Sequence, residues 1–111
     1  MSASRAFSTS AKKALVWVGA TELDLIAANG SRGPKVVEAV HAIEAHAEAM
    51  YPGKASVLKI QGTKLHKSTK DPNETEEVVS VSVLTESGTR LLSGHAQASG
   101  GFTTHTARAG R

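Results

Sequence analysis

The clearest pattern in the chain is a run of apolar residues at helical spacing that begins just after Pro34. Spacings of four and three residues place such side chains on one face of a helix, and a proline at the first helical position costs no intrahelical hydrogen bond. The turn residues Tyr51, Pro52 and Gly53 end the pattern. The sequence therefore predicts a helix over residues 34–50, with a buried face formed by Val36, Val40, Ile43, Ala47 and Met50.

A period of two, typical of strands, replaces the helical period downstream. Residues 56–65 and 77–85 are predicted to form an antiparallel hairpin with a long polar tip. A turn at residues 86–88 and a further antiparallel strand over 89–98 follow. The Gly, Ser, Thr and Arg of residues 99–111 predict a disordered tail. In the second strand Val79, Val81 and Val83 alternate with Ser80, Ser82 and Leu84, which predicts one buried face.

The segment before the long helix is compatible with two local structures. As a helix over residues 22–29 it has Thr21 as N-cap, an acid three residues later and Gly30 as terminator. As a strand it has Leu23 and Leu25 in alternation and delivers the chain into a turn at Gly30. Local propensity favours the helix, and both alternatives stay open at this point.

Composition and charge exclude several classes of function. A chain of 111 residues, 40% of them apolar, is long enough for one compact domain, which we place at residues 14–98. The lack of cysteine excludes disulfides, and no apolar run approaches the length of a membrane span, so we expect a soluble protein with no membrane partner. The formal charge of +3 lies in the chain ends, because residues 14–107 hold eight Lys/Arg against ten Asp/Glu.

A glycine-rich turn, Gly30-Ser31-Arg32-Gly33, stands directly before the long helix. Free backbone N–H groups at a helix N-terminus attract anions, and glycines let a phosphate approach the backbone. We therefore take Gly30, Ser31 and Gly33 as a candidate backbone phosphate loop, with Arg32 and Lys35 adding charged contacts. Taken alone, the motif is explained better by a tight connection that needs positive φ.

Around this turn, small and β-branched residues recur in one frame, and a helix, a turn and a hairpin follow. In this order, residues 22–85 resemble the second strand, loop, second helix and hairpin of Alba proteins. The resemblance implies a two-layer α+β fold of order β-α-β-α-β-β with an antiparallel C-terminal hairpin. Residues 5–15 would then form the first strand and its lysine loop, and the first helix would be shortened to about 14–20. The matching positions are Ala28, Gly30, Lys35, Val36, Val37 and Val40.

The resemblance also implies a function, which is binding of RNA or DNA by a homodimer or by a heterodimer with a related subunit. Such binding is directed to the nucleic-acid backbone, depends on salt and is weakly sequence-specific. The implied contacts are Lys12 and Lys13 in the first loop, Arg32 and Lys35 by the central loop, and Lys64, Lys67 and Lys70 on the hairpin arm.

Residues 1–13 have a second interpretation as a targeting segment. They are basic, rich in serine and free of acid, and Arg5-Ala6-Phe7-Ser8 is similar to a mitochondrial processing site. We therefore expect an intracellular protein, located in the nucleus or cytoplasm or, alternatively, in the mitochondrion.

Three other functions fit parts of the pattern. KH modules, which bind RNA, have the same order of helix, G-x-x-G turn, helix and strand. A helical structure of residues 22–29 would favour this alternative. A non-catalytic accessory subunit, in mitochondria or elsewhere, would pair an exposed strand edge with a partner. A small hotdog-like enzyme with His95 as candidate base is the third alternative, but the chain lacks the length and a supporting acid for it.

The histidines do not predict a metal site. His41 and His46 are five positions apart, about 140° around a helix, and cannot ligate one ion. The remaining histidines, 66, 95 and 105, stand on separate segments, so we interpret all five as surface or pairing residues. No serine-nucleophile motif or P-loop occurs. The sequence therefore predicts a binding protein that has no cofactor and no metal and is not an enzyme.

Overall fold

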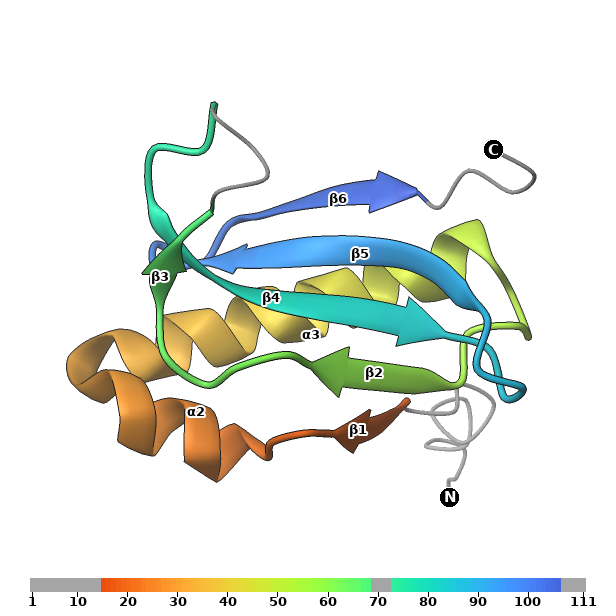
Figure 1. Cartoon of the computed structure of the whole chain (residues 1–111), viewed down its shortest axis with the longest axis horizontal. Helices are drawn as coiled ribbons and strands as arrows, with labels where there is room; N and C mark the ends of the chain where they lie inside the picture. The colour runs from red at the N-terminus through yellow and green to blue at the C-terminus, as the bar shows by residue number, and fades with distance from the viewer. Residues whose placement is uncertain (1–14, 69–72, 107–111) are drawn as a thin grey trace, which may run out of the picture.

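The computed structural model describes residues 15–68 and 73–106, which form a mixed α+β structure (Figure 1). A six-stranded mixed sheet has the strand order β1-β2-β4-β5-β6, with β3 paired to β4. The strands are β1 (Val16–Val18), β2 (Val57–Ile60), β3 (His66–Lys67), β4 (Glu77–Leu84), β5 (Arg90–Gln97) and β6 (Phe102–Thr106). The helices are α2 (Glu22–Asn29) and α3 (Gly33–Met50), joined by the short 3-10 helix η1 (Gly30–Arg32).

The sheet is antiparallel except at one edge, where β1 runs parallel to β2. Helix α3 runs along one face of the sheet and contacts β4, β5 and β6, while α2 packs against α3 (Figure 1). A parallel pair requires a crossover connection, and α2, η1 and α3 together make this crossover. Both helices therefore belong to a single layer on the sheet.

Residues 22–29 are helical, as local propensity favours. The Thr21 hydroxyl accepts a hydrogen bond from the Asp24 N–H, and the Asp24 carboxylate accepts one from the Thr21 N–H. This capping box satisfies two N–H groups at the helix N-terminus, and Gly30 ends the helix at a φ of +60°. The strand alternative for this segment is wrong. Within the described residues, no strand lies between β1 and β2, so the expected β-α-β-α-β-β order is not observed there.

The observed bounds of the long helix are close to those predicted from its apolar spacing. Predicted over residues 34–50, it spans Gly33–Met50 and has Pro34 in its first turn. Its buried face includes Val36, Val40, Ile43 and Ala47. Met50 is an exception because it is 44% exposed. Tyr51, the C-cap, packs against the core just beyond this last helical residue.

The predicted hairpin is present, but its first strand is interrupted. Strand β2 pairs with the second half of β4 through residue 60, and β3 rejoins β4 at its first two residues. The further strand predicted at residues 89–98 is β5. Within β4, Val79, Val81 and Val83 are buried in the core, as their alternation predicts.

Two segments of the chain are strands where we expected other structures. Residues 14–20 do not form a shortened helix, because 16–18 are β1. Residues 102–106 of the expected disordered tail form β6, since pairing with β5 supplies backbone hydrogen bonds that a Thr-rich segment alone could not. Residues 107–111 and the predicted first strand and lysine loop, up to residue 14, lie outside the described residues.

The buried apolar side chains of the described residues form one cluster between the sheet and the helices. Ile43 of α3 lies so close to β5 that a Cβ at Gly94 would stand 2.9 Å from its Cδ1, which shows why glycine occupies that strand position. The largest fully buried members of the cluster are Leu25, Ile43, Leu58, Leu92, Val36, Val40, Val79, Val81 and Val83.

Candidate nucleic-acid interface

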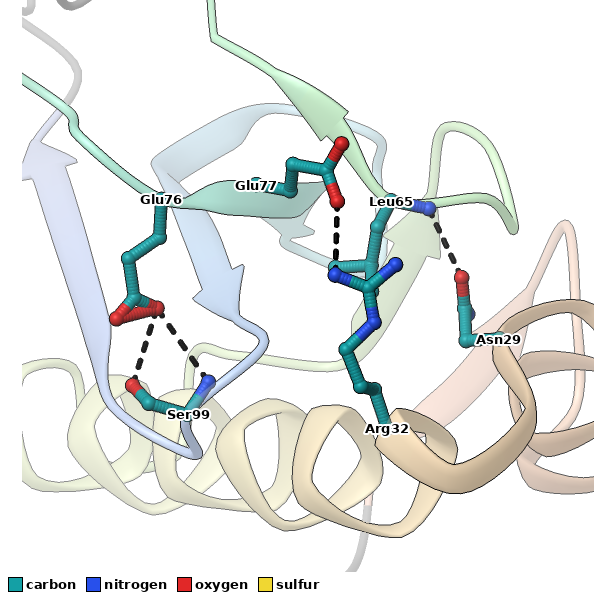
Figure 2. Close-up of polar contacts among 6 residues, drawn as sticks. All are labelled: Asn29, Arg32, Leu65, Glu76, Glu77 and Ser99. Carbon is teal, nitrogen blue, oxygen red and sulfur yellow. Dashed lines mark hydrogen bonds and ion pairs between the residues drawn. The ribbon is translucent and has the colours of Figure 1, made fainter.

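The turn at residues 30–33 and the connection between β2 and β4 lie side by side (Figure 2). This connection, residues 61–76, is hereafter the arm; it contains β3, and its residues 69–72 lie outside the described part of the chain. Asn29, the last residue of α2, joins the turn to the arm. Its side-chain Nδ2 donates to the Thr63 carbonyl at 2.7 Å, and its Oδ1 accepts from the Leu65 N–H at 2.9 Å. Two regions singled out separately in the sequence are therefore adjacent.

The far end of the arm is fixed by acidic side chains (Figure 2). Glu76 Oε1 accepts hydrogen bonds from the N–H and the hydroxyl of Ser99, at 3.3 and 3.0 Å. Ser99 lies in the turn between β5 and β6. Together with Asn29, Glu76 attaches the described ends of the arm to the folded domain.

The glycine turn does not have the form of a phosphate loop. The Gly30 N–H already donates to the Ile26 carbonyl, and the Gly33 N–H donates to the Gly30 carbonyl. Gly33 is buried, and a Cβ there would stand 2.5 Å from the Ile26 Cα. Gly30 thus provides the positive φ that ends α2, and Gly33 allows α2 and α3 to approach closely. Of the three predicted loop residues, only the exposed Ser31 has neither of these roles.

The cations beside the turn are neutralised by neighbouring acids. Arg32 Nη1 donates to Glu77 Oε1 at 2.8 Å, and Lys35 Nζ lies 3.7 Å from Glu38 Oε1. All four side chains are at least 40% exposed, so the stability that these pairs contribute is small, but each acid reduces the positive potential available to a phosphate.

The lysines of the arm are in a different state. Lys64 and Lys67 are exposed, as is Lys59 on β2, and none of the three forms an ion pair with a described carboxylate. Of the other predicted contacts, Lys12, Lys13 and Lys70 lie outside the described residues. Among the described residues, the predicted cations without a carboxylate partner therefore lie on the arm and not on the turn.

Glu74, a residue of the arm, forms a buried contact with His95 of β5 on the sheet face opposite α3. Glu74 is 2% exposed and accepts a hydrogen bond from Gln97 Nε2 at 2.8 Å. Its Oε1 lies 3.7 Å from Nδ1 of His95, a side chain that is 9% exposed. Glu74 is thus an acid near His95 that sequence reasoning missed, because the contact spans 21 positions and depends on the pairing of β4, β5 and β6. Both groups are too enclosed to meet a substrate in this conformation.

A second cluster joins β1, α2 and α3 around His41. His41 Nδ1 lies 2.8 Å from Glu44 Oε1, and Nε2 lies 2.6 Å from Glu22 Oε2. The other Glu44 oxygen accepts from the indole N–H of Trp17 at 2.9 Å. The local Glu–His pairing expected on this helix face is present. The contacts to Glu22 and Trp17 are additional and connect residues that are far apart in the sequence.

Protonation of His41 is coupled to stability. Burial lowers the pKa of the ring, but the hydrogen bonds and charges of Glu44 and Glu22 outweigh burial, so the pKa lies above its ordinary value of 6.5. A raised pKa in the folded state stabilises the protein at pH values below 6.5, and this stabilisation is lost as the pH rises through the folded-state pKa. Because His41 is 48% exposed, we expect its contribution to stay below about 1 kcal/mol.

Comparing H41Q with the native chain in thermal melts at several pH values tests this coupling. The difference in Tm should be largest near pH 5.5 and should shrink above the unfolded-state pKa. The variant H66Q, which changes an exposed histidine of β3, is the control for a histidine-to-glutamine change outside this cluster. A native-minus-H41Q difference that stays constant with pH would contradict the assigned coupling.

Comparisons with known proteins leave the family open: no protein-family model, curated protein or solved structure matches the chain. Among the described residues, no group of three His, Asp, Glu or Cys side chains is arranged to hold a metal ion. In the same residues, neither helix is long and apolar enough to span a membrane.

Proposed function

We propose that this protein binds nucleic acid and that the arm is its main contact surface. The observation that carries the proposal is that Lys64 and Lys67 of the arm are exposed and form no ion pair with a carboxylate of the described residues, beside a turn whose cations are paired with acids. Lysines without protein partners are available to displace the counterions condensed on a phosphate backbone. Binding of this kind is directed to the backbone and weakly sequence-specific.

The anchoring of the arm supports this role. An ordered loop loses less conformational entropy on binding than a free one. Asn29 and Glu76 fix the two ends of the arm, so the lysine at position 64 is presented next to an anchored residue, Leu65. Lys59 and Lys67 pair with Ser82 and Glu77 of β4, five positions apart, so these two lysines point to opposite faces of the sheet and the proposal rests on Lys64 and Lys67 of the arm.

The helical state of residues 22–29 favours a KH-like arrangement over an Alba-like one. The order α2, G-x-x-G, α3 and β2 is the order expected of a KH module, and the arm follows the strand. This chain departs from that pattern because the N–H groups of Gly30 and Gly33 donate hydrogen bonds to backbone carbonyls of the protein. We therefore assign the phosphate contacts to the arm. Dimerisation and cellular location remain predictions from the sequence.

Filter binding of generic single-stranded RNA, single-stranded DNA and duplex DNA at several salt concentrations tests the proposal. We expect binding at low salt that weakens steeply as salt rises. In the variant K64E/K67E, loss of two phosphate contacts should reduce the slope of log K against log salt by about 1.4 on a single strand, and affinity at low salt should fall at least about tenfold.

The matched control is K54E/R90E, which changes the net charge equally at the opposite end of the sheet. Lys54 and Arg90 are exposed and form no ion pair with a described carboxylate. This control should retain affinity within about twofold, apart from a general effect of net charge. No retention of any nucleic acid at low salt would reject the function, and equal losses in both variants would reject the arm as its site.

A further inference from the structure

A shallow cavity of about 360 Å³, largely open to solvent, lies at the β1 edge of the molecule, on the side of the sheet that carries the helices. The lining residues are Leu15, Trp17, Thr21, Glu22, His41 and Glu44. None of them belongs to the arm, so this cavity is separate from the proposed nucleic-acid interface.

The charges around the cavity favour a cation. Two carboxylates, Glu22 and Glu44, converge on one imidazole, and the cluster keeps a net negative charge even when His41 is protonated. Glu44 uses both oxygens, one for His41 and one for Trp17. The described contacts of Glu22 involve only Oε2, and this side chain is 53% exposed, so its carboxylate retains acceptor positions for a ligand.

The apolar part of the lining restricts the kind of cation. The indole of Trp17 is held by its hydrogen bond to Glu44, and an aromatic face fixed in this way attracts a cation that reaches it. Leu15 adds a buried apolar surface that a hydrated metal ion would not use. A cationic head attached to a short aliphatic chain satisfies both the carboxylates and the apolar wall.

We propose that this cavity binds the ammonium group of an aliphatic amine, with Glu22 as its carboxylate partner and Trp17 as its aromatic wall. The same chemistry is offered by a small amine and by a lysine side chain. Lys12 and Lys13 stand three and two positions before Leu15 in the sequence, so the chain itself contains candidate ammonium groups; their placement lies outside the described residues.

The single tryptophan of the chain makes the proposal directly measurable. Titration with n-butylammonium chloride at constant ionic strength should shift the Trp17 fluorescence and the indole N–H resonance in a saturable manner, with a Kd of the order of 1–10 mM. The neutral isostere 1-butanol, at the same concentrations, should give no saturable change.

Two variants separate the site from general electrostatics. E22Q should weaken butylammonium binding about fivefold or more, because it removes the exposed carboxylate but leaves the cavity shape. E38Q is the matched control: Glu38 is on α3, as are His41 and Glu44, but lies beside the turn between β5 and β6. It makes the same charge change and should bind like the native chain.

A further variant, K12Q/K13Q, distinguishes the two sources of the ammonium group. If only this variant responds to butylammonium, the chain's own lysines occupy the cavity, and the proposal stands with that source. If the native chain responds, a free amine has access. An equal response to 1-butanol, equal losses in E22Q and E38Q, or no response in either the native chain or K12Q/K13Q would overturn the proposal. None of these readouts involves nucleic acid, so failure here is separable from failure of the proposed function.

Discussion

Replacement of Gly19 by alanine is expected to lower the free energy of unfolding by about 3–4 kcal/mol, the largest effect that we predict for a single methyl group. Gly19 connects β1 to the N-cap of α2 with a φ of +93°, a region that L-residues rarely adopt. A Cβ at this position would stand 2.3 Å from the carbonyl oxygen of Ile60, a backbone atom that cannot move without disturbing β2. Strain of about 1–2 kcal/mol and overpacking of about 1–3 kcal/mol therefore add.

The appropriate comparison is G88A in the turn between β4 and β5. Gly88 has a φ of +96°, but a Cβ there would meet nothing within 4 Å. This variant carries the backbone strain alone and should cost about 1–2 kcal/mol. Thermal melts should place G19A about 12 °C below the native chain and clearly below G88A. Equal Tm values for the two variants would show that the close contact with Ile60 does not constrain the fold.

Replacement of Gly33 by alanine is expected to destabilise the protein by about 2 kcal/mol, although alanine is normally the better helix former. Gly33 has ordinary helical angles, with a φ of −56°. In an exposed helix, the change would therefore stabilise by up to about 1 kcal/mol. Here a Cβ would stand 2.5 Å from the Ile26 Cα, so the methyl group must push α2 away from α3.

The same variant separates the two explanations of the glycine turn. If the turn is a packing element, G33A lowers Tm by about 8 °C, and the protein that remains folded at low temperature binds nucleic acid as before. If the turn is a phosphate loop, binding is lost without a change in Tm. G62A is the control, because a Cβ at Gly62 meets nothing within 4 Å and its φ is not in the left-handed region. It should stay within about 1 kcal/mol of the native chain.

At the candidate interface, the sequence predicts which cations are exposed but not which of them are paired with acids. Lysines 64 and 67 were predictable as an exposed group, because they stand in a polar connection between two apolar strands. The state of their neighbours was not predictable. Arg32 and Glu77 are 45 positions apart, and only the packing of the turn against β4 brings their charges together. A cation counted toward the interface from the sequence is therefore neutralised in the fold.

The His41 cluster illustrates the same limit. The pairing of His41 with Glu44 follows from helical spacing, since side chains three positions apart are neighbours on a helix. The contact of Glu22 with His41 requires α2 to pack on α3, and that of Trp17 with Glu44 requires β1 to join the sheet edge. The cavity that we assign to an ammonium group is lined by the residues that these two contacts bring together.

The sequence by itself determined the elements whose information is local. Apolar spacing determined α3, alternation determined β4, and a turn signal indicated β5, whereas the capping box and terminal glycine favoured α2 without excluding a strand. Periodicity and capping act within one or two turns of chain, so they can be read without knowing the partner of each element.

Only the tertiary structure decided the elements and sites that depend on a neighbour. Strands β1 and β6 are short segments at the two edges of the sheet, and their backbone groups obtain hydrogen bonds only from β2 and β5. The burial of Gly33, the joining of the turn to the arm by Asn29 and the pairing of Arg32 likewise require segments distant in sequence. The sequence shows which hydrogen bonds and charges a side chain can contribute, whereas the fold determines which neighbouring group it contacts.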